Sequence, residues 1–154
     1  MADPFSIVAG TAGLTDVCIK LLHLIKQGKD SFQAVDDELK GLCNEVERLR
    51  SVNDLVEDAY KAELSLSSDP TYQKIFASNW YATEVTLGGC REVVEKIDQL
   101  LTDVLKEARG KHVKIDRLRI WLKQQSKEDA FNALRQKLSA HQNALQTSLQ
   151  AVNL

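Results

Sequence analysis

The sequence contains few of the residues that interrupt helices. Its 154 residues include only 2 prolines and 7 glycines, and aromatic residues make up 6% of it. Hydrophobic residues account for 44% and charged residues for 27%. This balance is typical of a globular, helical protein and excludes an extended disordered chain. The length fits one domain, residues 1–154, built around a single core.

Cysteine is also scarce, and its spacing does not match a metal site. Cys18, Cys43 and Cys90 are odd in number, far apart and without a C-x-x-C pair. The pattern indicates neither a disulfide framework nor a zinc site, and it fits a reducing cytosol. We interpret the three cysteines as small apolar fillers of the core. Neither His23 nor His112 has a second ligand at metal spacing, so we expect no metal and no cofactor.

A strong net charge and the motifs of common enzymes are missing as well. The formal net charge is −2, which gives no reason to expect a nucleic-acid partner. The chain has no phosphate loop, no G-x-S-x-G elbow and no H-E-x-x-H pair. The pair Gly88 and Gly89 lacks the further glycines of a dinucleotide site. We therefore expect a protein that is not an enzyme.

No apolar run of the sequence is long enough to span a bilayer without interruption. Residues 4–15 are uncharged, but Asp16 and Lys20 interrupt the segment short of the roughly 18 to 20 residues that a span needs. A basic segment before the apolar run is missing too. As written, the segment is predicted to be neither a signal peptide nor a transmembrane helix.

Helical periodicity is the strongest positive feature of the chain. An N-cap acid followed by Pro4 predicts a first helix that runs to about Gln27. Apolar residues recur three and four apart from Phe32 to Tyr60, with one break at Asn53, and predict a long second helix. Acidic residues outnumber basic ones along this helix, so its outer surface should be negative.

Two more long helices are predicted in the second half. Residues 66–72 form a turn, residues 72–82 suit a short helix, and a third long helix begins at residue 85 or 86 and runs to Arg109. The adjacent Gly88 and Gly89 leave its start open.

The segment after the third helix fits either a short helix or an irregular connector. Ser126 with Asp129 resembles a capping box that opens the last helix, which continues to the end of the chain. The expected fold is an all-α bundle of four major helices with short connectors. Within it, Trp80 and Tyr81 should lie in the core rather than at a membrane interface, and His141 in a hydrogen-bonded helix seam.

Several segments, in order and spacing, resemble one family. They are the opening D-P-x-S-I-x-x-G-x-x-G-L, the long second helix, the stretch "LGGCREVVEKIDQLLTDVL" and the close "RIWLKQQSKEDAFNALRQKLSAHQNALQTSLQ". Over nearly the whole chain they resemble the HeLo-like N-terminal domains of fungal signal-transducing NTPases and related cell-death proteins. The resemblance implies a fold like the four-helix killer domain of the necroptosis pseudokinase. It also implies a role in fungal incompatibility or innate immunity, in the cytoplasm and, after activation, at the plasma membrane.

The same resemblance implies a site in the first helix. In that family the helix is proposed to leave the bundle and enter the membrane after oligomerisation. The matching residues here are Pro4, Phe5, Ser6, Ile7, Val8, Ala9, Gly10, Ala12, Gly13 and Leu14. The implied partners are further copies of the chain, membrane lipids and a signal-transducing NTPase in cis or in trans.

Two explanations for the glycines of this helix stay open. Each glycine costs about 1 kcal/mol relative to alanine inside a helix, so Gly10 and Gly13 need a reason to be there. One reason is close packing against a neighbouring helix of the bundle. The other is that Ser6 with Gly10 and Ala9 with Gly13 form small-x-x-x-small pairs, which allow close helix contacts in lipid. Both can hold in different states.

A basic segment is the second candidate site. Between residues 106 and 127, eight basic residues stand against two acidic ones. The predicted patch consists of Lys111, Lys114, Arg117, Arg119 and Lys123. Each such residue contributes about 1 kcal/mol toward an anionic membrane surface. The alternative is a solvated connector that pairs with the acidic second helix. For the whole chain, the rival function is an adaptor bundle that oligomerises or docks on a protein without touching lipid.

Overall fold

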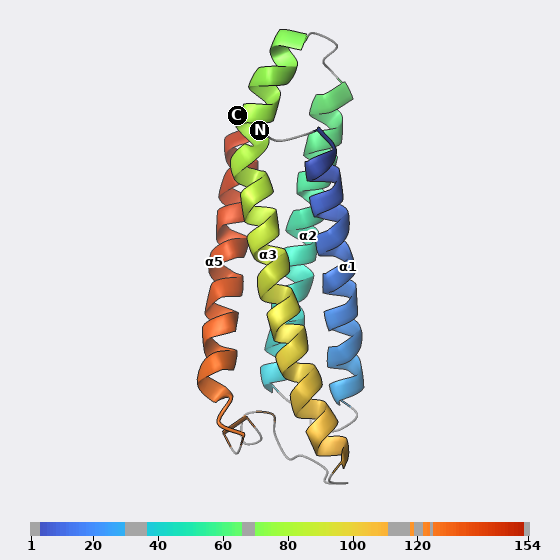
Figure 1. The fold of residues 1–154 in the computed structure, drawn as a ribbon, viewed down its shortest axis with the longest axis vertical. Coiled ribbons are helices and arrows are strands. Elements are labelled where there is room, and N and C mark those ends of the chain that lie inside the picture. Colours follow the sequence, from blue (N-terminus) through green and yellow to red (C-terminus); the bar gives the residue numbers. More distant parts are fainter. Residues whose placement is uncertain are drawn as a thin grey trace.

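Four long helices make up most of the residues that the structure describes. This structure is a computed structural model, and it describes residues 4–29, 37–65, 70–110, 118, 122–123 and 125–152. The helices are α1 (Pro4–Lys29), α2 (Asp37–Ser65), α3 (Pro70–Gly110) and α5 (Glu128–Val152) (Figure 1). The predicted all-α four-helix bundle is confirmed, and no strand occurs in the described part of the chain.

The order of the helices around the bundle differs from their order in the sequence. α1 lies beside α2 and α3, and α5 lies beside α3 and α2, so α2 and α3 occupy a diagonal of the bundle (Figure 1). α1 and α3 run in the same direction. Their register is constant, because Gly10 faces Leu87 and Gly28 faces Leu105, both pairs being 77 residues apart.

The core is built from the apolar stripes that the sequence predicts. The buried members of these stripes are Leu39, Leu42, Val46, Leu49, Val56 and Tyr60 of α2, Cys90, Val94, Ile97, Leu101 and Leu105 of α3, and Phe131, Leu138, Leu145 and Leu149 of α5. Burial raises the pKa of the Cys18 and Cys90 thiols to about 12, as expected of apolar fillers. The predicted start of the second helix at Phe32 lies outside the described residues.

The two adjacent aromatic residues of α3 have different environments. Trp80 is fully buried, lies edge-on to Tyr60 with the ring centroids 5.2 Å apart, and donates a hydrogen bond from Nε1 to Glu63 at 3.2 Å. Its predicted core position is confirmed. The same prediction for Tyr81 is wrong, since that residue is 54% exposed. One step along a helix rotates a side chain by about 100°, which places Tyr81 on the outer face.

The predicted separation of residues 72–82 from the third helix is wrong, because α3 is continuous over 41 residues. Gly89 lies inside it for a packing reason. A Cβ there would stand 2.6 Å from Cδ2 of His141, so the bare backbone makes room for the imidazole of α5. The ring donates a hydrogen bond from Nδ1 to the Lys137 carbonyl at 2.7 Å, and the predicted seam role of His141 is confirmed.

The start of α5 also differs from the prediction. Ser126 has a left-handed φ of 57°, and its N–H donates to the Lys123 carbonyl at 3.1 Å. The Lys127 N–H donates to the Leu122 carbonyl at 2.8 Å. These two bonds form a Schellman motif, which closes the turn before α5. Ser126 therefore ends one element and does not cap the next, so the predicted capping box is wrong.

An ion-pair clamp that sequence analysis missed joins α2 to α5. Arg135 of α5 reaches Glu38 at 2.6 Å and Glu45 at 2.7 Å, and its side chain is 21% exposed. A Cβ on Gly41 would stand 3.0 Å from the guanidinium, so this glycine leaves space for it. Part of the negative outer surface predicted for α2 is absent, because these two carboxylates turn toward Arg135.

The left-handed residue of the Schellman motif gives a stability prediction. An L-residue in this conformation is strained by about 1–2 kcal/mol, whereas glycine adopts it without strain. Glycine also gives the unfolded chain more conformational entropy, which offsets part of that gain. We expect Ser126→Gly to raise the free energy of unfolding by about 0.5–1 kcal/mol in urea denaturation. Ser126→Ala retains the Cβ and should give no gain. A Ser126→Gly variant no more stable than Ser126→Ala would contradict the assignment.

Candidate functional site

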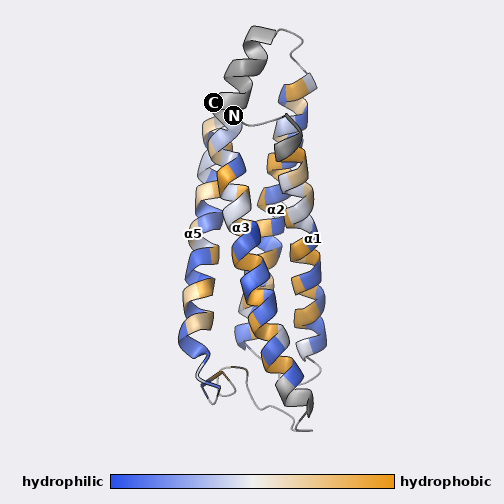
Figure 2. Cartoon of the chain, viewed as in Figure 1, coloured by the Kyte–Doolittle hydropathy of each residue, from blue (hydrophilic) through white to orange (hydrophobic). Residues whose placement is uncertain are grey.

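The helix α1 is apolar on its inner face, and the outer face of its first half is apolar as well. Ile7 and Leu14 are buried in the core, while Val8, Ala9 and Ala12 are exposed to solvent. Apolar residues recur along the described length of the helix (Figure 2). Pro4, Phe5 and Ser6 belong to its first turns, and predictions about their side chains lie outside the described residues. From Asp16 onward the exposed face carries the polar stripe that is normal for a surface helix, so only the outer face of the first half is unusual. The stripe consists of Asp16, Lys20, His23 and Gln27.

Among the described helices, only α1 is long and apolar enough to cross a membrane. The segment is Ile7–Gly28, of which 33% is buried within the bundle. The sequence prediction that Asp16 and Lys20 rule out a span is too strict by these criteria. The two charges pair with each other at 3.2 Å, one helical turn apart on the exposed face. A core helix of a soluble bundle can have the same length and apolar composition. The length and composition of α1 are therefore compatible with both a bundle core and a membrane.

The two glycines near the start of α1 face α3. A Cβ on Gly10 would stand 3.3 Å from Cδ1 of Leu87, and one on Gly13 would stand 2.8 Å from Nη1 of Arg91. Close packing within the bundle is therefore sufficient to explain Gly10. At Gly13 the neighbour is the end of a flexible side chain, which is 53% exposed. In this state α3 covers one edge of the small-residue face and Ala9 stays open.

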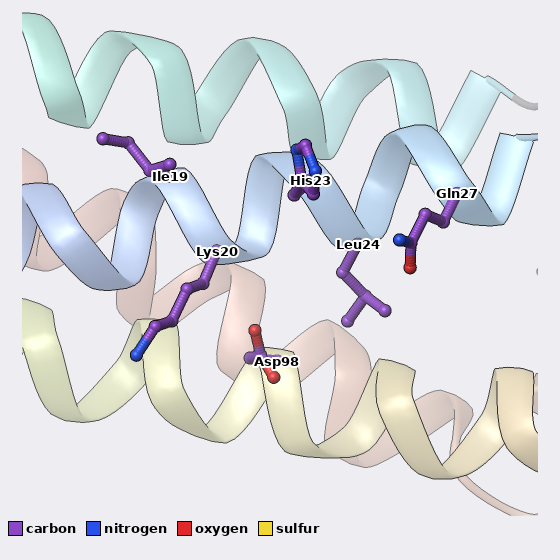
Figure 3. A pocket seen from close by; sticks show the side chains of 6 residues that line it. All are labelled: Ile19, Lys20, His23, Leu24, Gln27 and Asp98. Carbon is purple, nitrogen blue, oxygen red and sulfur yellow. The ribbon is translucent and has the colours of Figure 1, made fainter.

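A shallow hollow lies between α1 and α3 further along the bundle. Its volume is about 450 Å³, and its lining consists of Ile19, Lys20, His23, Leu24 and Gln27 of α1 and Asp98 of α3 (Figure 3). Asp98 accepts a hydrogen bond from the Thr102 hydroxyl at 3.2 Å, and Lys20 is paired with Asp16. This hollow could not be predicted from the sequence, because the register of two non-consecutive helices creates it. Its charged groups already have partners, and no cluster of metal-ligating side chains occurs in the described part of the chain.

The predicted basic patch falls mostly outside the described residues. Lys111, Lys114, Arg117 and Arg119 lie there, together with Trp121. Lys123 is described and exposed. Leu118 and Leu122 are fully or almost fully buried, so this part of the connector packs against the bundle. The gathering of the five basic residues on one surface stays a prediction.

Comparison of the chain with known protein families, curated proteins and solved structures finds no match. The resemblance to HeLo-like domains thus rests on the sequence segments quoted above.

The two kinds of glycine contact predict opposite effects of added methyl groups. In Gly13→Ala the Arg91 guanidinium can swing into solvent, and the gain in helix propensity should raise the free energy of unfolding by about 0.5–1 kcal/mol. In Gly89→Ala the methyl group displaces the His141 ring and breaks its bond to Lys137, which should lower that free energy by about 1 kcal/mol. Urea denaturation measures both.

A matched control isolates the ring contact at Gly89. Adding His141→Ala to Gly89→Ala should remove most of the cost of the methyl group, as a double-mutant cycle would show. Destabilisation by Gly13→Ala of more than about 1 kcal/mol would mean that α1 requires a glycine there for packing.

Proposed function

We propose that this chain is a HeLo-like signalling domain that oligomerises and acts on membranes through α1 in a regulated cell-death or innate-immunity pathway. The observation that supports the proposal best is the apolar outer face of α1, where Val8, Ala9 and Ala12 are exposed next to a buried apolar face. A helical segment that is apolar all round, as the first half of α1 is, suits a lipid environment better than a bundle surface. The segment quoted as D-P-x-S-I-x-x-G-x-x-G-L lies in this part of the chain.

The energetics favour an oligomer over a single inserted helix. Asp16 and Lys20 would each cost about 2.5–3.5 kcal/mol near the bilayer centre. Their mutual ion pair reduces this cost, and contacts with further copies would reduce it again. A lone α1 would therefore lie in the interface until other copies join it. In this proposal the partners are further copies, anionic lipids bound by the basic patch, and a signal-transducing NTPase in cis or in trans.

The proposed cellular course follows from the same energetics. The bundle buries the inner face of α1 and is expected in the cytoplasm before activation. After activation it would relocate to the plasma membrane, whose inner leaflet carries the anionic lipids. Neither an enzymatic activity nor a nucleic-acid partner belongs to the proposal.

A protein adaptor is the second candidate, and one surface of α3 favours it. Tyr81 is 54% exposed and Val85 is 58% exposed, one helical turn apart on the outer face. Gly88 follows on the same side, and a Cβ there would have no neighbour within 4 Å. A partner protein can cover such an apolar stripe while α1 stays in place.

A charge placed on the outer face of α1 tests the membrane proposal. Val8 is 37% exposed, so Val8→Glu should leave the fold intact but oppose entry of α1 into lipid. We expect it to reduce dye release from liposomes containing anionic lipid by at least about tenfold, with each protein fused to an inducible oligomerisation tag. The matched control is Leu55→Glu on α2, where the native residue is 56% exposed, and it should leak like the parent.

The other outcomes separate the candidates. Equal loss of leakage in both variants would indicate a general effect of charge and argue against a specific role of α1. If no form of the chain causes leakage while circular dichroism confirms the fold, the adaptor becomes the better assignment.

A further inference from the structure

Asn53 is a polar residue in the seam between α1 and α2, where it meets Thr11 and Thr15. It is fully buried, and its Nδ2 group donates to the Thr11 carbonyl at 2.9 Å and to the Thr15 hydroxyl at 2.8 Å. Its Oδ1 atom is buried without a hydrogen-bond partner. Both N–H donors of the amide thus bind α1. On burial the amide oxygen loses its hydrogen bonds to water, and it forms none within the protein.

A second buried oxygen without a partner lies near the same end of the bundle. The Thr83 hydroxyl of α3 is buried and has no hydrogen-bond partner. Thr83 stands one helical turn before Leu87, which faces Gly10. The constant register between α1 and α3 therefore places Thr83 beside the first turns of α1. Asn53 Oδ1 and Thr83 Oγ1 are the two such side-chain atoms in the described part of the chain, and both accompany the first half of α1.

The two halves of α1 are anchored unequally. Within residues 7–15, the part of the first half whose side chains the structure describes, Ile7 and Leu14 are the buried apolar residues, and the buried residue between them is Thr11. Gly10 and Gly13 also weaken the helix in this half. The second half buries Val17, Cys18, Leu21 and Ile25 without a polar residue among them. The described part of the first half thus combines a polar residue in its buried face with a less stable backbone.

We infer that Pro4–Thr15 opens as a unit separate from the rest of α1, and that Asn53 controls this opening. The two donors of Asn53 fix the segment in register on α2. Its unpaired oxygen keeps the docked segment less stable than an apolar seam would. The inference deepens the proposed function, because exposure of this segment is the step that the function requires. It concerns the protein in water, however, and can be tested without lipid.

Hydrogen exchange of the full chain tests the inference directly. Amides that open locally exchange faster than those that need global unfolding. The first helical N–H groups lack acceptors, so the comparison uses residues 9–15 against residues 18–25. We expect the protection factors of residues 9–15 to be at least about tenfold lower. Equal protection in the two halves would overturn the inference, because α1 would then open only as a whole.

Two substitutions at Asn53 test its control of the segment. Asn53→Leu removes the unpaired oxygen and extends the apolar seam, so it should slow exchange of residues 9–15 by about tenfold. Asn53→Asp replaces the NH2 group with a carboxylate oxygen, which cannot donate to the Thr11 carbonyl and repels it. This variant should speed exchange of residues 9–15 by at least about tenfold. Exchange of residues 18–25 should change much less in both. The matched control is Asn44→Leu, an exposed asparagine of α2, which should change neither half.

The outcomes distinguish this inference from the proposed function. Unchanged exchange of residues 9–15 in Asn53→Leu and Asn53→Asp would refute the role of Asn53. If either variant does not fold, the other one and the parent chain still decide. If the protein causes no liposome leakage but shows the expected exchange pattern, the membrane function is rejected. The separate opening of the first half of α1 would still hold.

Discussion

The close packing of α1 against α3 is the contact on which the rest of the bundle depends. α1 touches α3 on one side and α2 on the other, so its position fixes two of the four seams of the ring. The approach is close because Gly10 and Gly28 stand where Leu87 and Leu105 of α3 reach across. A Cβ at Gly10 would stand 3.3 Å from Leu87 Cδ1 and one at Gly28 would stand 3.2 Å from Leu105 Cδ1, so even a methyl group would force these leucines to shift by a few tenths of an ångström. The parallel arrangement then leaves α2 and α3 on a diagonal, joined where Tyr60 meets Trp80.

Elements whose stability is local could be predicted from the sequence. Contacts between helices that are far apart in the sequence could not. The stripe from Leu39 to Tyr60 follows from helical period alone, and it is buried as expected. Asn53 breaks that apolar pattern in the sequence, yet it is buried. Its amide donates hydrogen bonds to α1, and no local sequence pattern predicts them. The pair Gly88 and Gly89 left the start of the third helix open on sequence alone, because the contact that explains Gly89 is with His141, more than fifty residues away. The apolar opening segment was visible from sequence, but its division into two unequal halves was not.

The polar ties between helices are distributed unevenly. α5 is attached to α2 by Arg135, whose guanidinium meets two carboxylates and lies 5.9 Å from the Phe131 ring centre. Hydrogen bonds that involve charged groups contribute about 1.5–3 kcal/mol, although partial exposure weakens these. α1 is attached to α2 by the neutral amide of Asn53, at the cost of an unpaired oxygen. Of the ties made by Arg135 and Asn53, the weaker one therefore belongs to the more apolar helix.

This difference limits how much of α1 can leave the bundle in water. Exposing a fully buried aliphatic side chain costs about 1.5–3 kcal/mol. Of the described side chains, residues 7–15 expose the buried aliphatic Ile7 and Leu14, a cost that a domain with a typical total stability of about 5–15 kcal/mol can sustain. The second half adds Val17, Leu21 and Ile25, and the sum then approaches the whole stability. Complete departure of α1 consequently requires a surface that accepts these side chains as they leave. Lipid or a second copy of the helix can provide that surface, and water cannot.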